Sequence, residues 1–126
     1  MDSPAVEVAL EAPYERVILP PPITIDRERI FVNPPTLHLG SGSSRLKTIQ
    51  WVNQTGGEVL IWLPNAYNYL EGNPGDFLLP KSIPVGRTLT FAVSPDCKDG
   101  YYHYNVFCKR INGYAEGNSE PGVSCP

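Results

Sequence analysis

The chain has 126 residues, of which 41% are hydrophobic and 18% are charged, and its formal net charge at neutral pH is -3. A chain of this size holds one hydrophobic core, since a second domain would leave both cores too small. The acidic balance and the scattered Lys and Arg residues argue against nucleic acid as a partner, and no apolar run approaches the roughly 20 residues that cross a bilayer. We expect a single domain over residues 1–126 that binds neither nucleic acid nor membrane.

The first residues and the cysteines bear on the compartment. Residues 1–20 lack the basic start and the continuous apolar stretch of a secretory signal, which favours the cytoplasm. The alternative is a secreted or periplasmic chain in which Met1 replaces a removed signal. The three cysteines, Cys97, Cys108 and Cys125, cannot all pair within one chain. We expect reduced thiols, and the alternative is one disulfide plus one buried thiol.

Short apolar and β-branched runs separated by turn residues predict an all-β fold. Fourteen prolines and eleven glycines interrupt the chain, and no window keeps a 3.6-residue apolar period. This pattern is typical of a sandwich or barrel, here a Greek-key fold with about 7 to 9 strands and little or no helix. In chain order, strands are expected at residues 6–10, 23–25, 29–32, 36–39, 46–53, 59–63, 88–93, 101–109 and 122–125. Residues 1–28 are then an N-terminal extension or edge strands.

Strict alternation on the later strands predicts which side chains form the core, because successive residues of a strand point to opposite faces. Trp51 and Ile49 share a face of the strand at 46–53 and are expected in the core. The other inward side chains expected from alternation are Leu89, Phe91, Val93, Tyr102, Tyr104, Val106 and Cys108. His103 and Asn105 fall on the opposite face.

The order of features from about residue 29 onward resembles a cupredoxin. Thr48-Ile-Gln-Trp-Val-Asn53 is similar to the strand of that family that ends in an aromatic residue, a spacer and Asn. Gly100-Tyr-Tyr-His-Tyr104 is similar to the strand that runs into the copper-binding cysteine. The resemblance covers roughly three quarters of the chain, and it implies a cupredoxin-like (plastocyanin-like) sandwich.

The ligands of a type-1 copper site are missing from this resemblance. Such a site takes two imidazoles and a thiolate, usually with a weak axial Met. Val59 stands about where the resemblance places the first His, and the ten residues after Cys108 contain neither His nor Met. The two histidines are His38, on an early strand, and His103, whose parity is opposite to that of Cys108. We therefore expect no copper, no other cofactor and no metal site.

Two places are candidate sites. The segment at 64–77 mixes amides with aromatics, and Tyr67 and Tyr69 would project to one side if the backbone were extended there. Asn65 and Asn68 complete this candidate interaction patch, which would suit a protein surface or sugar rings. The alternative is that these rings seal the end of the sandwich. Cys108 is a candidate reactive thiol beside Lys109, and a buried small hydrophobe is the favoured alternative.

The motifs of common enzyme classes are absent from the sequence, so we expect no catalytic residues. The favoured function is that of a copper-free, non-catalytic sandwich that binds a protein partner or self-associates. One alternative is an atypical metal protein that uses Cys108 or Cys97 with His38. The other is a carbohydrate-binding module built on the loop at 64–77. Asn53-Gln-Thr55 also forms a possible glycosylation sequon at a turn.

Overall fold

The structure is a computed structural model that describes the backbone of residues 5–19, 23–114 and 121–126, together with their side chains apart from those of residues 11–29 and 31. The described residues are all-β, with strands in three sheets, three short 3-10 turns and no α-helix. The strands are β1 (Ala5–Leu19), β2 (Ile23–Asn33), β3 (Thr36–His38), β4 (Thr48–Gln54), β5 (Val59–Trp62), β6 (Lys81–Ile83), β7 (Thr88–Ala92), β8 (Gly100–His103), β9 (Asn105–Cys108), β10 (Gly113–Tyr114) and β11 (Gly122–Cys125). The 3-10 turns are η1 (Gly42–Ser44), η2 (Ala66–Asn68) and η3 (Pro74–Phe77).

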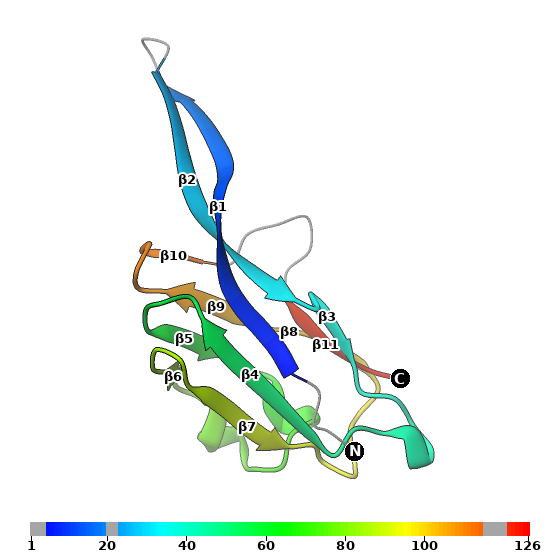
Figure 1. The fold of residues 1–126 in the computed structure, drawn as a ribbon. Helices are drawn as coiled ribbons and strands as arrows, with labels where there is room; N and C mark the ends of the chain where they lie inside the picture. The colour runs from blue at the N-terminus through cyan, green and yellow to red at the C-terminus, as the bar shows by residue number, and fades with distance from the viewer. Residues whose placement is uncertain (1–4, 20–22, 115–120) are drawn as a thin grey trace.

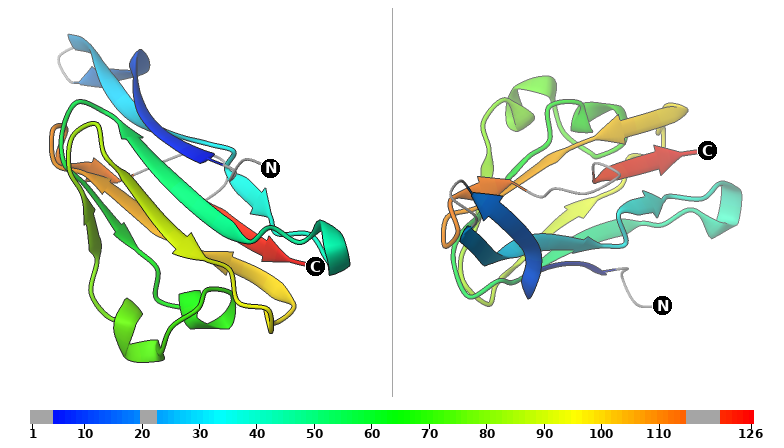
Figure 2. Two further views of the ribbon diagram at one scale, coloured as in Figure 1. Left: turned by 60° about the horizontal axis from the view of Figure 1, so that its bottom comes forward. Right: turned by 90° about the horizontal axis from the view of Figure 1, so that it is seen from above.

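The strands form two four-stranded sheets and one three-stranded sheet. The first sheet has the order β2-β1-β4-β7, the second β10-β9-β5-β6 and the third β3-β11-β8. The pairs β1 with β4 and β3 with β11 are parallel, and the other pairs are antiparallel. Figures 1 and 2 show the first sheet lying over the second and third, so the core lies between these layers. No helix of the described residues is long and apolar enough to cross a membrane.

The core follows from alternation along the strands. On β4, Ile49, Trp51 and Asn53 are buried while the residues between them are half-buried. Trp51 lies edge-on to Phe91 and to Tyr104, with ring centroids 6.0 and 5.6 Å away. The predicted burial of Trp51 and Ile49 is confirmed, because neither side chain is exposed at all.

The alternation expected on the later strands is also confirmed. Val93, Tyr104, Val106 and Cys108 are buried, and Leu89, Phe91 and Tyr102 are half-buried against the core. His103 and Asn105 are exposed. The stretch at 101–109 is nevertheless two strands, because β8 belongs to the third sheet and β9 to the second. The chain changes sheet at Tyr104, whose N–H donates to the carbonyl of Pro121 at 3.0 Å and so continues the β8–β11 register by one residue before β9 begins.

The N-terminal strands are longer than the sequence indicated. The runs at 23–25 and 29–32 are parts of one strand, β2, and the run at 6–10 is only the beginning of β1. Strand β1 pairs with β4 only over Ala5–Ala9. Beyond that point β1 and β2 pair with each other alone and form a two-stranded ribbon, which Figure 1 shows extending past the other strands. Residues 1–28, expected as an extension or edge strands, therefore include most of this ribbon.

Candidate functional site

The predicted patch at Asn65, Tyr67, Asn68 and Tyr69 lies on η2 and its ends. The backbone here is a 3-10 turn, so the condition for both rings to project to one side is not met. Tyr67 is 43% exposed, whereas Tyr69 is only 1% exposed. The Tyr69 ring lies 5.1 Å from that of Tyr102, and burial raises the pKa of its hydroxyl above the usual range. Of the two rings, only Tyr67 is available to a partner.

The two tyrosines should therefore respond differently to truncation. We expect Tyr69→Ala to lower the free energy of unfolding by about 3 kcal/mol, because it empties a packed site. Tyr67→Ala should change stability by no more than about 0.5 kcal/mol, as is usual for an exposed side chain. Urea unfolding of both variants measures the difference. Equal losses from the two variants would show that η2 does not separate the rings as described.

Cys108, the candidate thiol, is fully buried at the end of β9. The basic neighbours are engaged elsewhere: Lys109 forms an ion pair with Glu58, and the Arg110 guanidinium donates to the carbonyl of Thr55 at 3.1 Å. Val59 lies directly opposite Cys108 on β5 and is also fully buried. The thiol is thus closed off from solvent, as in the alternative of a small buried hydrophobe.

Cys97 and Cys125 form a disulfide, so the expectation that the thiols are reduced was wrong. The alternative stated from the sequence, one disulfide plus one buried thiol, is the arrangement found, because Cys108 is free and buried. Strand β11 pairs antiparallel with β8, and Cys125 lies opposite Gly100. This register places Cys125 beside the first residue of β8, next to the loop that carries Cys97.

The residues considered for an atypical metal site are not brought together. His38 and His103 are exposed on β3 and β8, which flank β11, while Cys108 is buried in the second sheet. Cys97 is held in the disulfide. Within the described part of the chain, no three His, Cys, Asp or Glu side chains gather where they could hold a metal ion.

The sequon asparagine is part of the interior. Asn53 Nδ2 donates to the carbonyls of Gly57 and Ile83 at 2.7 and 2.8 Å, and its Oδ1 accepts from the hydroxyl of Thr55 at 2.7 Å. Asn53 and Thr55 are both buried. A glycan on Nδ2 would remove these bonds and leave buried carbonyls without a donor. The folded structure is therefore built on an unmodified Asn53.

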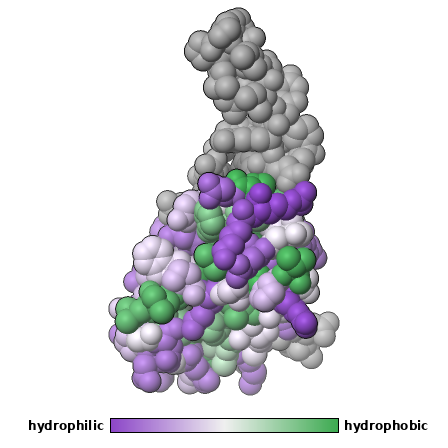
Figure 3. All heavy atoms as spheres, turned by 90° about the vertical axis from the view of Figure 1, so that its left-hand side faces the viewer, coloured by the Kyte–Doolittle hydropathy of each residue, from purple (hydrophilic) through white to green (hydrophobic). Residues whose placement is uncertain are grey.

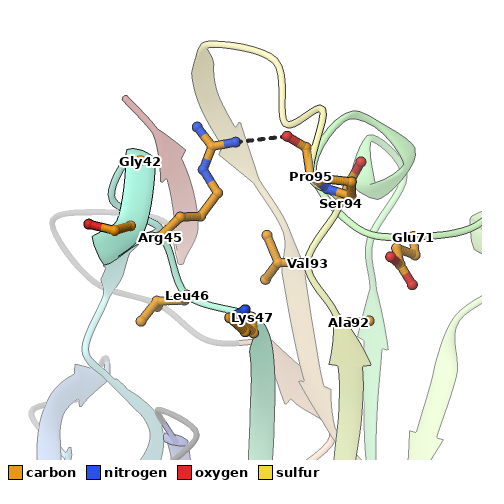
Figure 4. A pocket seen from close by; sticks show the side chains of 10 residues that line it. Gly42, Arg45, Leu46, Lys47, Glu71, Ala92, Val93, Ser94 and Pro95 are labelled. Atoms are coloured by element: carbon orange, nitrogen blue, oxygen red, sulfur yellow. Dashed lines mark hydrogen bonds between the residues drawn. The ribbon is translucent and has the colours of Figure 1, made fainter. Parts of the chain in front are cut away.

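A hollow of about 550 Å³ opens between η1 and the end of β7. Figure 4 shows Arg45 reaching over it, where Nη1 donates to the carbonyl of Pro95 at 3.2 Å. Lys47 and Glu71 also line the hollow, around apolar surface from Val93. These charged groups give it a mixed polar rim, and the hydrogen bond from Arg45 ties together the two loops that form it.

The outer face of the second sheet is apolar. The sequence alone had not indicated this surface as a candidate site. In the register, Tyr114 of β10 lies opposite Phe107 of β9, and Phe107 lies opposite Leu60 of β5. Trp62 follows two residues after Leu60 and has the same orientation. We call these four residues the aromatic face. Trp62 and Tyr114 are 45% and 61% exposed, and the rings of Phe107 and Tyr114 are 5.0 Å apart.

Polar residues border the aromatic face. Glu58 forms an ion pair with Lys109 and accepts a hydrogen bond from the hydroxyl of Ser82. Both contacts hold the pKa of the Glu58 carboxyl below its usual range, and the contact with Lys109 has the larger effect. Asn105 lies opposite Trp62 at the other end of β9. The border therefore offers hydrogen-bonding groups to a partner, and its two opposite charges, on Glu58 and Lys109, neutralise each other.

The outer face of the first sheet is different. Its rows across β1, β4 and β7 join Ala5 with Gln50 and Thr90, and Glu7 with Val52 and Thr88. Such a mainly polar row is what the solvated face of a sheet usually carries. Figure 3 views a different side, the left-hand side of Figure 1, and shows mostly hydrophilic residues there with hydrophobic ones in separate patches. Scattered apolar residues need no partner, whereas a connected row of rings marks an interaction surface.

Comparison with known proteins identifies no family for this chain. No protein-family model matches the chain, and no curated protein matches it in sequence.

Proposed function

We propose that this chain is a non-catalytic β-sandwich that binds a protein partner through the aromatic face of its second sheet. The observation that carries the proposal is the difference between the two outer faces. One is polar, while the other presents Trp62, Phe107 and Tyr114 on adjacent strands. The four side chains project from a hydrogen-bonded sheet. Few of them would therefore have to become ordered when a partner binds.

The chemistry of the aromatic face suits a protein interface. Aromatic residues are enriched in the cores of interfaces, and Trp and Tyr often contribute most of the binding energy. Here the rings occupy the centre, while Glu58, Lys109, Ser82 and Asn105 form a polar rim. Since Glu58 and Lys109 already neutralise each other, covering this face would leave no isolated charge.

The fold is further proposed to be a copper-free relative of the cupredoxins. The resemblance places the first His ligand at about Val59, which lies on β5. It places the Cys ligand close to Cys108, which lies on β9. The register pairs Val59 with Cys108 and Ile61 with Val106 across these strands. Their adjacency supports a cupredoxin-like arrangement, and the apolar residues there provide packing in place of ligands.

The two alternatives have less support. A metal site from Cys97 or Cys108 with His38 would need residues that lie in different sheets, one of them in a disulfide. A carbohydrate site on the loop at 64–77 would have Tyr67 without Tyr69, because the second ring is buried. Neither arrangement matches the connected surface of the aromatic face.

A photo-reactive amino acid placed on each outer face tests the proposed function. We expect the group at position 62 to form a discrete cross-link to a protein, because it replaces Trp62 at the proposed interface. The same group at position 90 is the matched control, since Thr90 is exposed on the polar face. Both variants are exposed to extract of the source organism and analysed by mass spectrometry. Equal labelling from both positions, or none from position 62, would contradict the proposal.

A further inference from the structure

The hollow between η1 and the end of β7 has two walls, and both are fixed to β11. The wall that carries η1 is closed by a hydrogen bond from the N–H of Leu46 to the carbonyl of Leu39 at 2.8 Å. The N–H of Leu39 in turn donates to the carbonyl of Ser124 on β11 at 2.9 Å. The opposite wall is joined to the same strand by the disulfide between Cys97 and Cys125. The fold itself therefore holds the shape of the hollow, which lowers the cost of ordering it around a ligand.

Arg45 crosses from one wall to the other and keeps donors for a ligand. Its Nε donates to the carbonyl of Gly40 at 3.3 Å, and its Nη1 donates to the carbonyl of Pro95 at 3.2 Å. A guanidinium has five N–H donors, so three of them remain. Among the described residues, no carboxylate forms an ion pair with Arg45. The guanidinium is thus held in place by carbonyl groups while its charge is still available to an anion.

Lys47 and Glu71 also line the hollow, and neither side chain forms an ion pair with a described residue. Figure 4 shows Arg45 and Lys47 on one side of Val93 and Glu71 on the other. The carbonyl of Lys47 accepts from the N–H of Val93, and the N–H of Glu71 donates to the carbonyl of Ala92. The backbones of Lys47 and Glu71 therefore flank the end of β7, two strand spacings or about 10 Å apart. Opposite charges thus lie on the two sides of an apolar floor without neutralising each other.

We propose that this hollow binds a short apolar peptide of about three residues with free ends. The carboxylate of the peptide lies at Arg45 and Lys47, its ammonium group lies at Glu71, and its side chains contact Val93 and Leu46. Three extended residues span about 10 Å, which matches the separation of the two sides. The two charges of a single amino acid are too close together to reach both.

The size of the hollow agrees with this ligand. Its volume of about 550 Å³ lies within the usual range of small-molecule sites. The proposal is independent of the aromatic face, which belongs to the second sheet, so either can fail without the other.

Three forms of one tripeptide test the site on the wild-type protein. The peptide Ala-Leu-Ala with free ends, its C-terminal amide and its N-acetyl form are titrated separately, and binding is followed by NMR chemical shifts. We expect each blocked form to bind about fivefold more weakly than the free form, because each loses a charge contact at a partly exposed site. The shifts should concentrate on residues 42–47 and 92–95.

Two variants assign the ends of the peptide. Glu71→Gln should bind the free and N-acetyl forms equally and should still prefer the free form to the amide. Lys47→Gln should lose part of the preference for a free carboxylate and keep the preference for a free ammonium group. The matched control is Arg87→Gln, which changes an exposed charge at the other end of β7 and should leave all three affinities unchanged.

Several outcomes would overturn the proposal. They are the absence of binding of the free peptide at millimolar concentrations, equal affinities for the three forms, and shifts confined to residues outside the hollow. A preference for the free ammonium group that persists in Glu71→Gln would count against it equally. The comparison of the three peptides on the wild type needs no variant, so a failure of either variant to fold would not weaken the test.

Discussion

Replacing Trp51 with Ala is expected to lower the free energy of unfolding by about 3 to 5 kcal/mol, the range for truncating a large buried aromatic. The ring is fully buried and lies edge-on to Phe91 and Tyr104, so the variant leaves a cavity and loses both contacts. Urea unfolding followed by circular dichroism measures the loss. Trp51→Phe should cost less, because it keeps a ring in the core and no described residue accepts a hydrogen bond from the buried Nε1 of Trp51.

Trp62→Ala is the matched control, since the chain has two tryptophans and this one is 45% exposed. We expect it to change stability by no more than about 0.5 kcal/mol. It also leaves Trp51 as the only tryptophan, and the fluorescence of that variant should have the short-wavelength maximum of a buried indole. A maximum typical of water, or equal losses from Trp51→Ala and Trp62→Ala, would show that the register of β4 is wrong.

Removing the disulfide is expected to cost roughly 3 to 4 kcal/mol. Cys97 and Cys125 are 28 residues apart, and a loop of that length gives this value when a cross-link restricts the unfolded chain. The variant carries Cys97→Ala and Cys125→Ala, and its unfolding is compared with that of the wild type with and without reductant. Reductant should destabilise the wild type and leave the double variant unchanged.

Cys108→Ala controls for the loss of a buried sulfur without the loss of a cross-link. It should cost about 1 kcal/mol, and reductant should still destabilise it, because the disulfide remains. If reductant has no effect on the wild type, the two cysteines are not joined in solution. Since such bonds persist only in oxidising surroundings, the same experiment bears on the compartment in which the chain is stable.

The sequence predicted the strands whose alternation is enforced by burial. On β4, Ile49 and Trp51 could be assigned to the core because Thr48 and Gln50, which point to the other face, are polar. Strands β6 and β10 could not be predicted, since they are very short and exist through pairing with β5 and β9. Such pairing depends on partners far along the chain, which local propensity does not report.

Strand β1 illustrates a different limit. The strand expected from the sequence ended at residue 10, before Pro13, and proline cannot donate to a ladder. In the structure it falls within the irregularity between Glu11 and Glu15, where pairing is interrupted anyway, and the strand continues to Leu19. The sequence could not reveal this, since the position of a bulge is set by the register with β2.

The aromatic face was partly legible in the sequence. Leu60 and Trp62 share one orientation in the strand expected at 59–63, and Phe107 lies opposite in orientation to the buried Val106. Tyr114 could not be added without knowing that β10 pairs with β9. The orientation of Tyr67 and Tyr69 was out of reach for a related reason, because it depends on whether the backbone there is extended or forms the 3-10 turn of η2.

The position of β11 has a consequence for synthesis on the ribosome. β3 and β8 both pair with β11 and not with each other, so the third sheet has no hydrogen-bonded ladder until residues 122–125 are present. The disulfide also needs Cys125. A nascent chain in which residues 122–125 are still missing would leave the edges of β3 and β8 open to wrong pairing. Formation of this layer must therefore wait until residues 122–125 have been synthesised, however early the first sheet can form.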